Sequence, residues 1–319
     1  MRFAWFVAQG LLKANLEDTV KAIVYTEYGP PDVLRLEELE TPVPGEGELL
    51  IKIYASSVNY SDWAFLSGKR FEVRMVQGLR KPKHTILGKD VAGRVEAIGH
   101  SVSQFQPGDE VYGDLSEWGF GAFAEYVAVS EAAVAPKPAN LTFAQTAAVP
   151  EAAVVALQAV RDKGEIRPGQ KVLIVGASGG IGTFAVQLAR AFGAEVTGVC
   201  STRNLELVRS LGADHVIDYA REDFVESGPR YDLIVATAGY RSIFDYRRAL
   251  RPGGIYVETG GAFAQIYQAL LLGPLLSRIG RKPMRSLMSK PNQRDLLVVK
   301  EMIEAGKVTP VIDRCYPLP

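Results

Sequence analysis

The chain is poor in the residues from which disulfide frameworks and metal sites are built. Its 319 residues include only 2 Cys and 3 His, and the two cysteines, Cys200 and Cys315, lie far apart. Neither a disulfide scaffold nor a cysteine-built zinc site can be assembled from them. A cysteine-poor chain fits a reducing compartment, so we expect a cytoplasmic protein.

The chain also lacks an excess of one charge and a long apolar run. Its 36 Lys and Arg balance its 36 Asp and Glu, so we expect no nucleic-acid partner. No apolar run reaches the roughly 18 residues that predict a membrane span. In the apolar stretch 266–279, Gly273-Pro274 argues against one continuous amphipathic helix and against a membrane-surface contact. We therefore favour a substrate-channel lid or a dimer contact for this stretch.

The first part of the chain has the pattern of a small β-rich domain. Short apolar segments bounded by Gly or Pro predict strands at residues 21–25, 48–55, 90–98, 109–112 and 123–129. Few helical patterns intervene, which favours a barrel-like unit over residues 21–141. Residues 1–20 are expected to be an N-terminal extension.

From residue 142 the pattern changes to alternating helices and strands. Thr142 is a predicted N-cap for a long Ala-rich helix over residues 143–161. Apolar strands are then expected at 171–175, 195–199, 215–217, 231–236 and 254–258, with helices at 181–192, 203–211 and 242–250. This alternation predicts a doubly wound parallel sheet, so the fold class is α/β.

A glycine-rich turn joins the first of these strands to its helix. It reads Gly176-Ala177-Ser178-Gly179-Gly180-Ile181-Gly182. Glycines let the backbone approach a pyrophosphate, and the helix N-terminus supplies amide donors. A dinucleotide is therefore expected here, the alternative being a turn that serves packing alone. A short-chain dehydrogenase would need Tyr-x-x-x-Lys further on, and no tyrosine here has lysine four places later.

The end of the second strand predicts which dinucleotide binds. Ser201, Thr202 and Arg203 stand about 20 residues after the turn, where an NAD site places a carboxylate against the ribose 2′-hydroxyl. Hydroxyls and a guanidinium suit a 2′-phosphate instead, which favours NADPH. The alternative interpretation makes Ser201 a helix N-cap and leaves Arg203 solvated.

Several separate motifs occur in an order that resembles one known family. They are Ser57-Val-Asn-Tyr-Ser-Asp62, Ile86-Leu-Gly-Lys-Asp-Val-Ala-Gly-Arg-Val95, Phe105-Gln-Pro-Gly-Asp-Glu-Val-Tyr112, Gly121-Ala-Phe-Ala-Glu-Tyr126, Arg167-Pro-Gly-Gln-Lys171 and Leu211-Gly-Ala-Asp-His215. With the late glycine turn, they resemble the zinc-independent, quinone oxidoreductase-like branch of the medium-chain dehydrogenase/reductase superfamily.

The resemblance implies a fold and a set of site residues. A GroES-like domain (21–141) would receive an inserted Rossmann domain (142–299), and the chain would return to the first domain at 300–319. Asn59 and Asp62 resemble the family's cleft-lining loop, although both could equally be turn formers. Tyr60 is a candidate donor to the developing enolate. Besides the turn and Ser201, Thr202 and Arg203, the expected cofactor set comprises Asn204, Tyr219, Thr237, Thr259 and Gly260.

The ligands that zinc-dependent relatives use are not found at the corresponding positions. Lys89-Asp90 follows Gly88 where those enzymes have a His-Glu pair, and His84, His100 and His215 are isolated in sequence. We therefore expect no metal, and hydride delivery from NADPH to a quinone or to the activated double bond of an enal or enone.

Four departures from the family pattern motivate an alternative. Ala64, Val155 and Asn204 replace a Tyr, a Thr and a Lys found in many members, and the pattern would continue with a helix and a strand after Leu318. A redox-inactive NADPH-binding or interaction protein that kept the fold is therefore the second hypothesis. A homodimer that covers an exposed sheet edge, or a fold-back of residues 1–20, is also expected.

Overall fold

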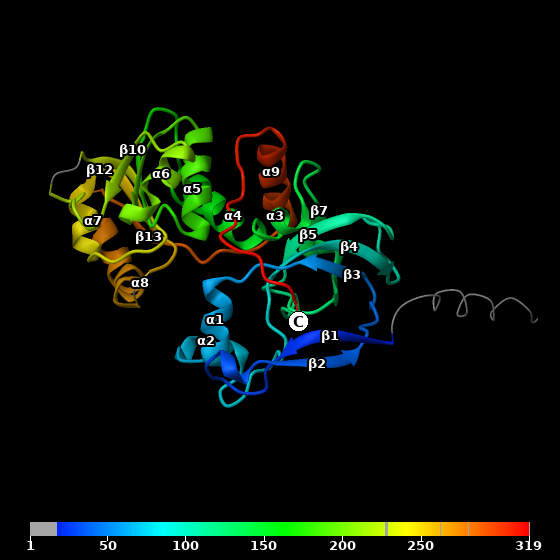
Figure 1. Cartoon of the computed structure of the whole chain (residues 1–319). Coiled ribbons are helices and arrows are strands. Elements are labelled where there is room, and N and C mark those ends of the chain that lie inside the picture. The colour runs from blue at the N-terminus through cyan, green and yellow to red at the C-terminus, as the bar shows by residue number, and fades with distance from the viewer. Residues whose placement is uncertain (1–17, 227–228, 262, 280, 319) are drawn as a thin grey trace, which may run out of the picture.

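Two large sheets organise the chain (Figure 1). The computed structural model describes residues 18–226, 229–261, 263–279 and 281–318. One sheet has five antiparallel strands in the order β6-β3-β4-β5-β7, and the other has six parallel strands in the order β10-β9-β8-β11-β12-β13. The expected α/β class, a GroES-like sheet joined to a Rossmann sheet, is confirmed.

The antiparallel sheet encloses its own apolar core. Its strands are β3 (Glu48–Ala55), β4 (Asp90–Ile98), β5 (Glu110–Asp114), β6 (Tyr126–Ser130) and β7 (Val134–Pro136), with a 3₁₀ turn (Glu131–Ala133) between the last two. Leu49, Ile51 and Val91 are fully buried in this core. A ribbon of β1 (Thr19–Val24) and β2 (Arg35–Glu40), with the 3₁₀ turn Pro31–Val33 between them, attaches through bridges from β1. Helices α1 (Tyr60–Ser67) and α2 (Phe71–Gln77) fill the connection between β3 and β4.

The parallel sheet has the strand order of a dinucleotide-binding fold. Its strands are β8 (Lys171–Val175), β9 (Glu195–Cys200), β10 (His215–Asp218), β11 (Tyr231–Ala236), β12 (Leu250–Glu258) and β13 (Met284–Ser286). The helices are α5 (Gly180–Ala191), α6 (Leu205–Ser210) after the 3₁₀ turn Thr202–Asn204, α7 (Ile243–Ala249), α8 (Phe263–Arg278) and α9 (Gln293–Glu304). The order reverses between β8 and β11, which predicts a ligand crevice at the carboxyl ends of these two strands.

The helix expected over residues 143–161 is broken, so that prediction was wrong. The structure has α3 (Phe143–Ala147), α4 (Pro150–Leu157) and a π-helical turn (Gln158–Lys163). The break falls where Pro150, which has no N–H to continue the preceding helix, starts a new one. These segments join the two halves, because α4 and α5 share one apolar core with Ala92 and Tyr112 of the antiparallel sheet.

The interruption expected at Gly273-Pro274 does not occur. Helix α8 runs through Pro274 without a break. Around the proline, the Ser277 hydroxyl donates to the Gly273 carbonyl (2.7 Å) and accepts from the Met284 amide (2.8 Å), which ties the helix to β13. Within the described part of the chain, no helix combines the length and apolar character needed to cross a membrane.

The chain returns to the antiparallel sheet through α9. The Tyr112 hydroxyl donates to the Leu296 carbonyl (2.6 Å), and the Gln293 side chain donates to the Val134 carbonyl (2.8 Å). This helix begins at Gln293, before the expected boundary at residue 300. Of the expected extension 1–20, residues 1–17 lie outside the described residues, and strand β1 begins at Thr19.

Candidate active site

The glycine turn after β8 has exposed backbone and leaves no room for side chains at two of its positions, Gly176 and Gly182. A Cβ at Gly182 would lie 2.0 Å from the Gly176 carbonyl oxygen, and Gly176 has a φ of +85°. Ala177 is fully buried, which explains why a small apolar residue follows Gly176. The first amides of an α-helix have no partner within the helix, so the start of α5 offers donors and a positive dipole end to an anion.

The other expected cofactor residues lie at the same edge of the sheet. Thr237 follows β11, and its hydroxyl donates to the Val175 carbonyl at 3.0 Å. Thr259 follows β12, and its amide donates to the Ala236 carbonyl at 3.0 Å. Parallel strands end on one edge, so the turn and the ends of β9, β11 and β12 are brought together.

The end of β9 contains a feature that sequence reasoning missed. The Thr202 hydroxyl donates to the Asp218 carboxylate (2.6 Å), and this bond holds the pKa of Asp218 below its usual range. A carboxylate from the neighbouring strand β10 therefore lies beside the expected 2′-phosphate residues. The Arg203 side chain is exposed, and Asn204 donates to the Ser178 hydroxyl (2.9 Å), linking this loop to the glycine turn.

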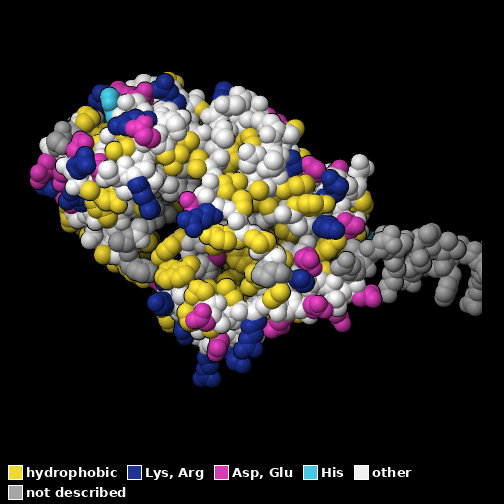
Figure 2. All heavy atoms as spheres, viewed as in Figure 1, with side chains coloured by type: hydrophobic (Ala, Val, Ile, Leu, Met, Phe, Trp, Pro, Cys, Tyr) yellow, Lys and Arg dark blue, Asp and Glu magenta, His cyan; other side chains and the backbone are white. Residues whose placement is uncertain are grey.

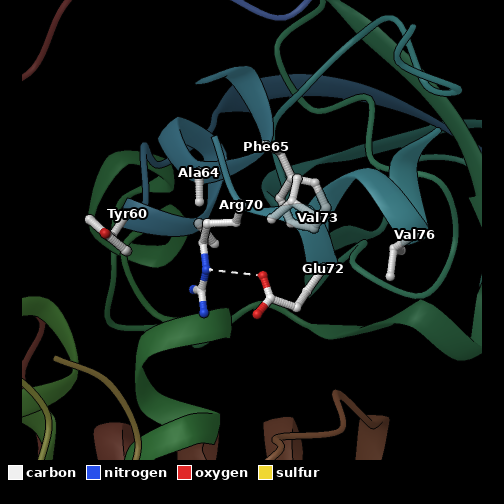
Figure 3. Close-up of a pocket in the computed structure, with 8 residues that line it drawn as sticks. Tyr60, Ala64, Phe65, Arg70, Glu72, Val73 and Val76 are labelled. Carbon is white, nitrogen blue, oxygen red and sulfur yellow. Dashed lines mark ion pairs between the residues drawn. The ribbon is translucent and has the colours of Figure 1, made fainter. Parts of the chain in front are cut away.

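A cavity of about 310 Å³ opens beside α1 and α2. Figure 2 shows a hollow between the two halves with hydrophobic side chains along its margins, and Figure 3 shows the cavity-lining residues. The lining is mainly apolar, with two hydroxyls, one cation and one carboxylate: Tyr60, Ser61, Ala64, Phe65, Arg70, Glu72, Val73 and Val76. Its volume lies at the lower end of the range for small-molecule sites.

Polar residues of the cavity reach the other half of the molecule. Arg70 pairs with Glu72 (4.0 Å), as Figure 3 shows, and Glu72 accepts a hydrogen bond from the Tyr267 hydroxyl of α8. Glu258, at the carboxyl end of β12, is buried, which raises its pKa, and the Arg70 charge partly offsets this shift. Arg70 therefore lies close enough to the carboxyl end of β12 to act on Glu258 electrostatically.

The expected cleft residues Asn59 and Asp62 lie at the start of α1. Asp62 is 3% exposed, and it accepts hydrogen bonds from the Asn59 amide (2.8 Å) and the Gly88 amide (3.3 Å). The motif forms the first turn of α1 rather than a loop. Neither residue is among those described as lining the cavity, whereas Tyr60 is. Asn59 and Asp62 form the N-terminal cap of α1, and their expected place in the cleft stays a prediction.

A buried polar cluster lies next to the cavity. The Ser61 hydroxyl donates to both carboxylate oxygens of Glu151 (3.0 and 2.9 Å), and the Lys89 ammonium lies 3.5 Å from Glu151. Lys89 also lies over the Phe65 ring, 5.1 Å from its centre. Behind this pair, Asp90 accepts from the Glu151 amide at 2.8 Å.

Burial shifts the carboxyl groups of the cluster toward their neutral forms. Desolvation raises the pKa of Asp62 to about 6 and raises that of Asp114. Desolvation, with the charges of Asp114 and Glu151, raises the pKa of Asp90 well above its usual value. The Lys89 charge lowers the pKa of Asp62 and Asp114 and so opposes the effect of burial.

The cluster does not fit a metal ion. Among the described residues, no group of three or more His, Cys, Asp or Glu is arranged to hold one. Lys89, which stands where zinc-dependent relatives place a histidine, brings an ammonium to this point, and that charge would repel a metal cation.

Sequence reasoning did not assign Ser61, Lys89, Glu151 and Arg70 to the site. A signal was present for Glu151, because a carboxylate stands in an otherwise apolar helical stretch. The sequence indicates for Lys89 only that it stands in the place of a zinc ligand. Its pairing with Glu151 joins positions 62 residues apart, a distance that no local pattern bridges.

Comparisons with known proteins agree with this architecture. Residues 45–139 match the alcohol dehydrogenase GroES-like domain, and residues 211–319 match a family described as zinc-binding dehydrogenase. The chain is 35% identical to 2-methylene-furan-3-one reductase of Solanum lycopersicum, over 94% of this chain and 73% of that protein. It is 34% identical to the chloroplastic NADPH-dependent alkenal/one oxidoreductase of Arabidopsis thaliana, over 96% of this chain and 75% of that protein.

A solved structure shows the same arrangement of domains. The quinone oxidoreductase from Coxiella burnetii superimposes with a TM-score of 0.82 and 28% identity, covering 94% of this chain and 92% of that one. The chain therefore belongs to the medium-chain dehydrogenase/reductase superfamily, in the branch of the quinone oxidoreductases and alkenal reductases.

Proposed function

We propose that this protein is an NADPH-dependent, zinc-independent reductase of quinones or of the activated double bond of enals and enones. The observation that carries the proposal is the mainly apolar cavity on α1 and α2, whose Glu72 accepts a hydrogen bond from Tyr267 of α8 in the other half of the molecule. The printed names of relatives support it, since they include an alkenal/one oxidoreductase and a quinone oxidoreductase.

The turn residues 176–182 would hold the cofactor pyrophosphate on the N-terminus of α5. Ser201, Arg203 and Asn204 would surround the 2′-phosphate, Tyr219 would lie against the adenosine end, and Thr237, Thr259 and Gly260 would line the nicotinamide end. The negative charge of Asp218 repels a phosphate, so the preference for NADPH over NADH depends on the positive charge of Arg203. When bound, NADPH supplies a hydride.

The cavity residues would position the acceptor and exclude water. The apolar carbon skeleton of the acceptor would contact Val73, Phe65 and Ala64. Its carbonyl group would then lie against the polar side chains of the cavity. Arg70, Tyr60 and Ser61 provide the donors that a developing enolate or hydroquinone anion needs.

A substrate panel tests the proposal. NADPH and NADH oxidation is measured with 3-penten-2-one, trans-2-hexenal and 1,4-naphthoquinone, and cofactor binding is measured separately by fluorescence. Turnover of at least one acceptor, with a preference for NADPH, is expected. If the protein binds NADPH but none of the acceptors causes NADPH oxidation, the result would contradict the reductase assignment and support the redox-inactive alternative.

The cytoplasmic location and the homodimer stay predictions. The names of the relatives refer to chloroplasts and mitochondria. Size-exclusion chromatography with light scattering tests the dimer.

A further inference from the structure

The Ser61 hydroxyl connects the cavity to the buried ion pair. Ser61 lines the cavity, and its oxygen lies 3.0 and 2.9 Å from the two carboxylate oxygens of Glu151. The Lys89 ammonium lies 3.5 Å from Glu151. These contacts form a continuous series of proton-carrying groups from the cavity wall into the interior.

This ion pair is costly to bury, and packing alone does not explain it. The side chains of Lys89 and Glu151 are 9% and 19% exposed, and the residues that follow Glu151 in α4 are small and apolar. Taking two charges out of water carries a large desolvation cost, and apolar replacements of such pairs are often neutral or stabilising. Glu151 lies in the first turn of α4, where the free amides of the helix N-terminus are close by.

We propose that Ser61 donates the proton that completes substrate reduction, and that Lys89 and Glu151 resupply it. The inference rests on the proposed function. After hydride addition to the β-carbon of an enone, the electrons of the double bond lie on the enolate. The Ser61 O–H bond breaks as a C–H bond forms at the α-carbon. The Lys89 ammonium transfers a proton to the Glu151 carboxylate, and the protonated Glu151 passes that proton to the Ser61 oxygen, which leaves Lys89 neutral and restores the Glu151 carboxylate. Lys89 then takes a proton from solvent, so the net consumption is one proton per turnover.

The surroundings of the pair are rich in acidic residues. Asp62, Asp90 and Asp114 lie close enough to interact electrostatically with Glu151, and burial raises the pKa of each. Lys89 brings a positive charge to this group, 3.5 Å from Glu151.

Ser61 is better placed for this role than Tyr60, the donor expected from the sequence. Tyr60 is 65% exposed, and its ring lies 5.5 Å from that of Trp63. Water reaches an exposed phenol, whereas the Ser61 hydroxyl is bonded to a buried pair. Tyr60→Phe is therefore expected to lower kcat less than Ser61→Ala, which should lower it by about 100-fold or more.

Two substrates and two variants at position 61 test the donor. Ser61→Ala should lower kcat for 3-penten-2-one by about 100-fold or more, since general acids contribute this much, with a small change in KM. Its effect on 1,4-naphthoquinone should be much smaller, because an oxygen anion takes a proton from water readily. Ser61→Thr, which keeps the hydroxyl, should recover most of the rate. Ser67→Ala is the matched control, because Ser67 lies on the same helix and bonds to the Ala64 carbonyl (3.2 Å).

The ion pair is tested both with and without turnover. In the cofactor-free chain, Lys89→Met and Glu151→Gln should each lower the melting temperature, because each leaves a buried charge unpaired. The double variant should recover part of that loss. With NADPH and 3-penten-2-one, the double variant should keep the wild-type KM, lose kcat and show a changed solvent isotope effect.

The outcomes separate the inference from the proposed function. If none of the tested acceptors supports NADPH oxidation by the wild-type protein, the proposed function and the proton path are both wrong. If it reduces the enone, but Ser61→Ala or the double variant keeps the wild-type kcat and solvent isotope effect, the proton path is wrong and the reductase assignment stands. Additive losses of melting temperature in the double variant would also contradict a coupled pair.

Discussion

The two sides of the cleft are built in different ways. The edge of the parallel sheet presents a turn whose shape depends on missing side chains at Gly176 and Gly182. The polar cluster beside the cavity depends on side chains instead, with Lys89 and Glu151 paired next to buried aspartates. A backbone site is specified by a short local motif, whereas a side-chain cluster assembles residues from distant segments. Substitutions in the side-chain cluster should therefore affect stability more than substitutions around the glycine turn.

The largest effect is expected at Asp90. Its carboxylate accepts from the Ser57 hydroxyl (2.5 Å), the Asn59 side chain (2.9 Å) and the Glu151 amide (2.8 Å). Asp90→Ala would leave these donors without their acceptor, at about 1–3 kcal/mol for each one that stays buried. Urea denaturation should show a loss of roughly 3–5 kcal/mol.

Two variants provide the comparison for Asp90. Asp90→Asn, which keeps one acceptor oxygen, should lose less than Asp90→Ala. Asp32→Ala, on an exposed 3₁₀ turn, should stay within about 0.5 kcal/mol of the wild type. A similar small loss for Asp90→Ala would mean that the cluster does not stabilise the fold.

The second effect is the pH dependence caused by Asp62. Its pKa is raised from 3.8 to about 6 in the folded chain, so between these values the folded chain holds a proton that the unfolded chain releases. The free energy of unfolding therefore falls as pH rises through this window. From pH 5 to pH 7 the loss from this group is about 1 kcal/mol.

Denaturation at both pH values checks this prediction. Asp62→Asn should remove about 1 kcal/mol of the decrease between pH 5 and pH 7, whereas Asp32→Asn should leave it unchanged. An identical pH dependence in wild type and Asp62→Asn would show that Asp62 is charged in the folded chain at both pH values.

The same contrast explains how much the sequence could predict. Strands β3, β4, β8 and β11 were predicted with the bounds that they have, because each is an apolar run between turn residues. Helix α1 was missed, because a capping pair, Asn59 and Asp62, has the composition of a turn. The Ser61, Glu151 and Lys89 contacts come from three segments, and only the folded chain brings them together.

The third effect concerns the turn itself. Gly182→Ala places a Cβ 2.0 Å from the Gly176 carbonyl oxygen, a contact that the backbone must move to relieve. Overpacking of this kind costs about 1–3 kcal/mol, and the displaced turn should lower NADPH affinity by at least about tenfold. Gly180→Ala is the control for stability, because its nearest neighbour would be 3.9 Å away. Equal melting temperatures for the two variants would contradict the close-approach argument.

The smallest effect on the fold, and the most selective one, is expected for Arg203→Ala. Arg203 is exposed and follows β9, so its removal should leave the melting temperature unchanged. It should weaken NADPH binding by about 1–3 kcal/mol, because a charge-assisted contact to the 2′-phosphate is lost, and should leave NADH binding nearly unchanged.

Arg209→Ala on α6 removes the same charge from a residue paired with Glu206 and serves as the control. Fluorescence titration with both cofactors measures the difference. Equal losses for NADPH and NADH would refute the role of Arg203, and the nearby Asp218 carboxylate would then favour NADH.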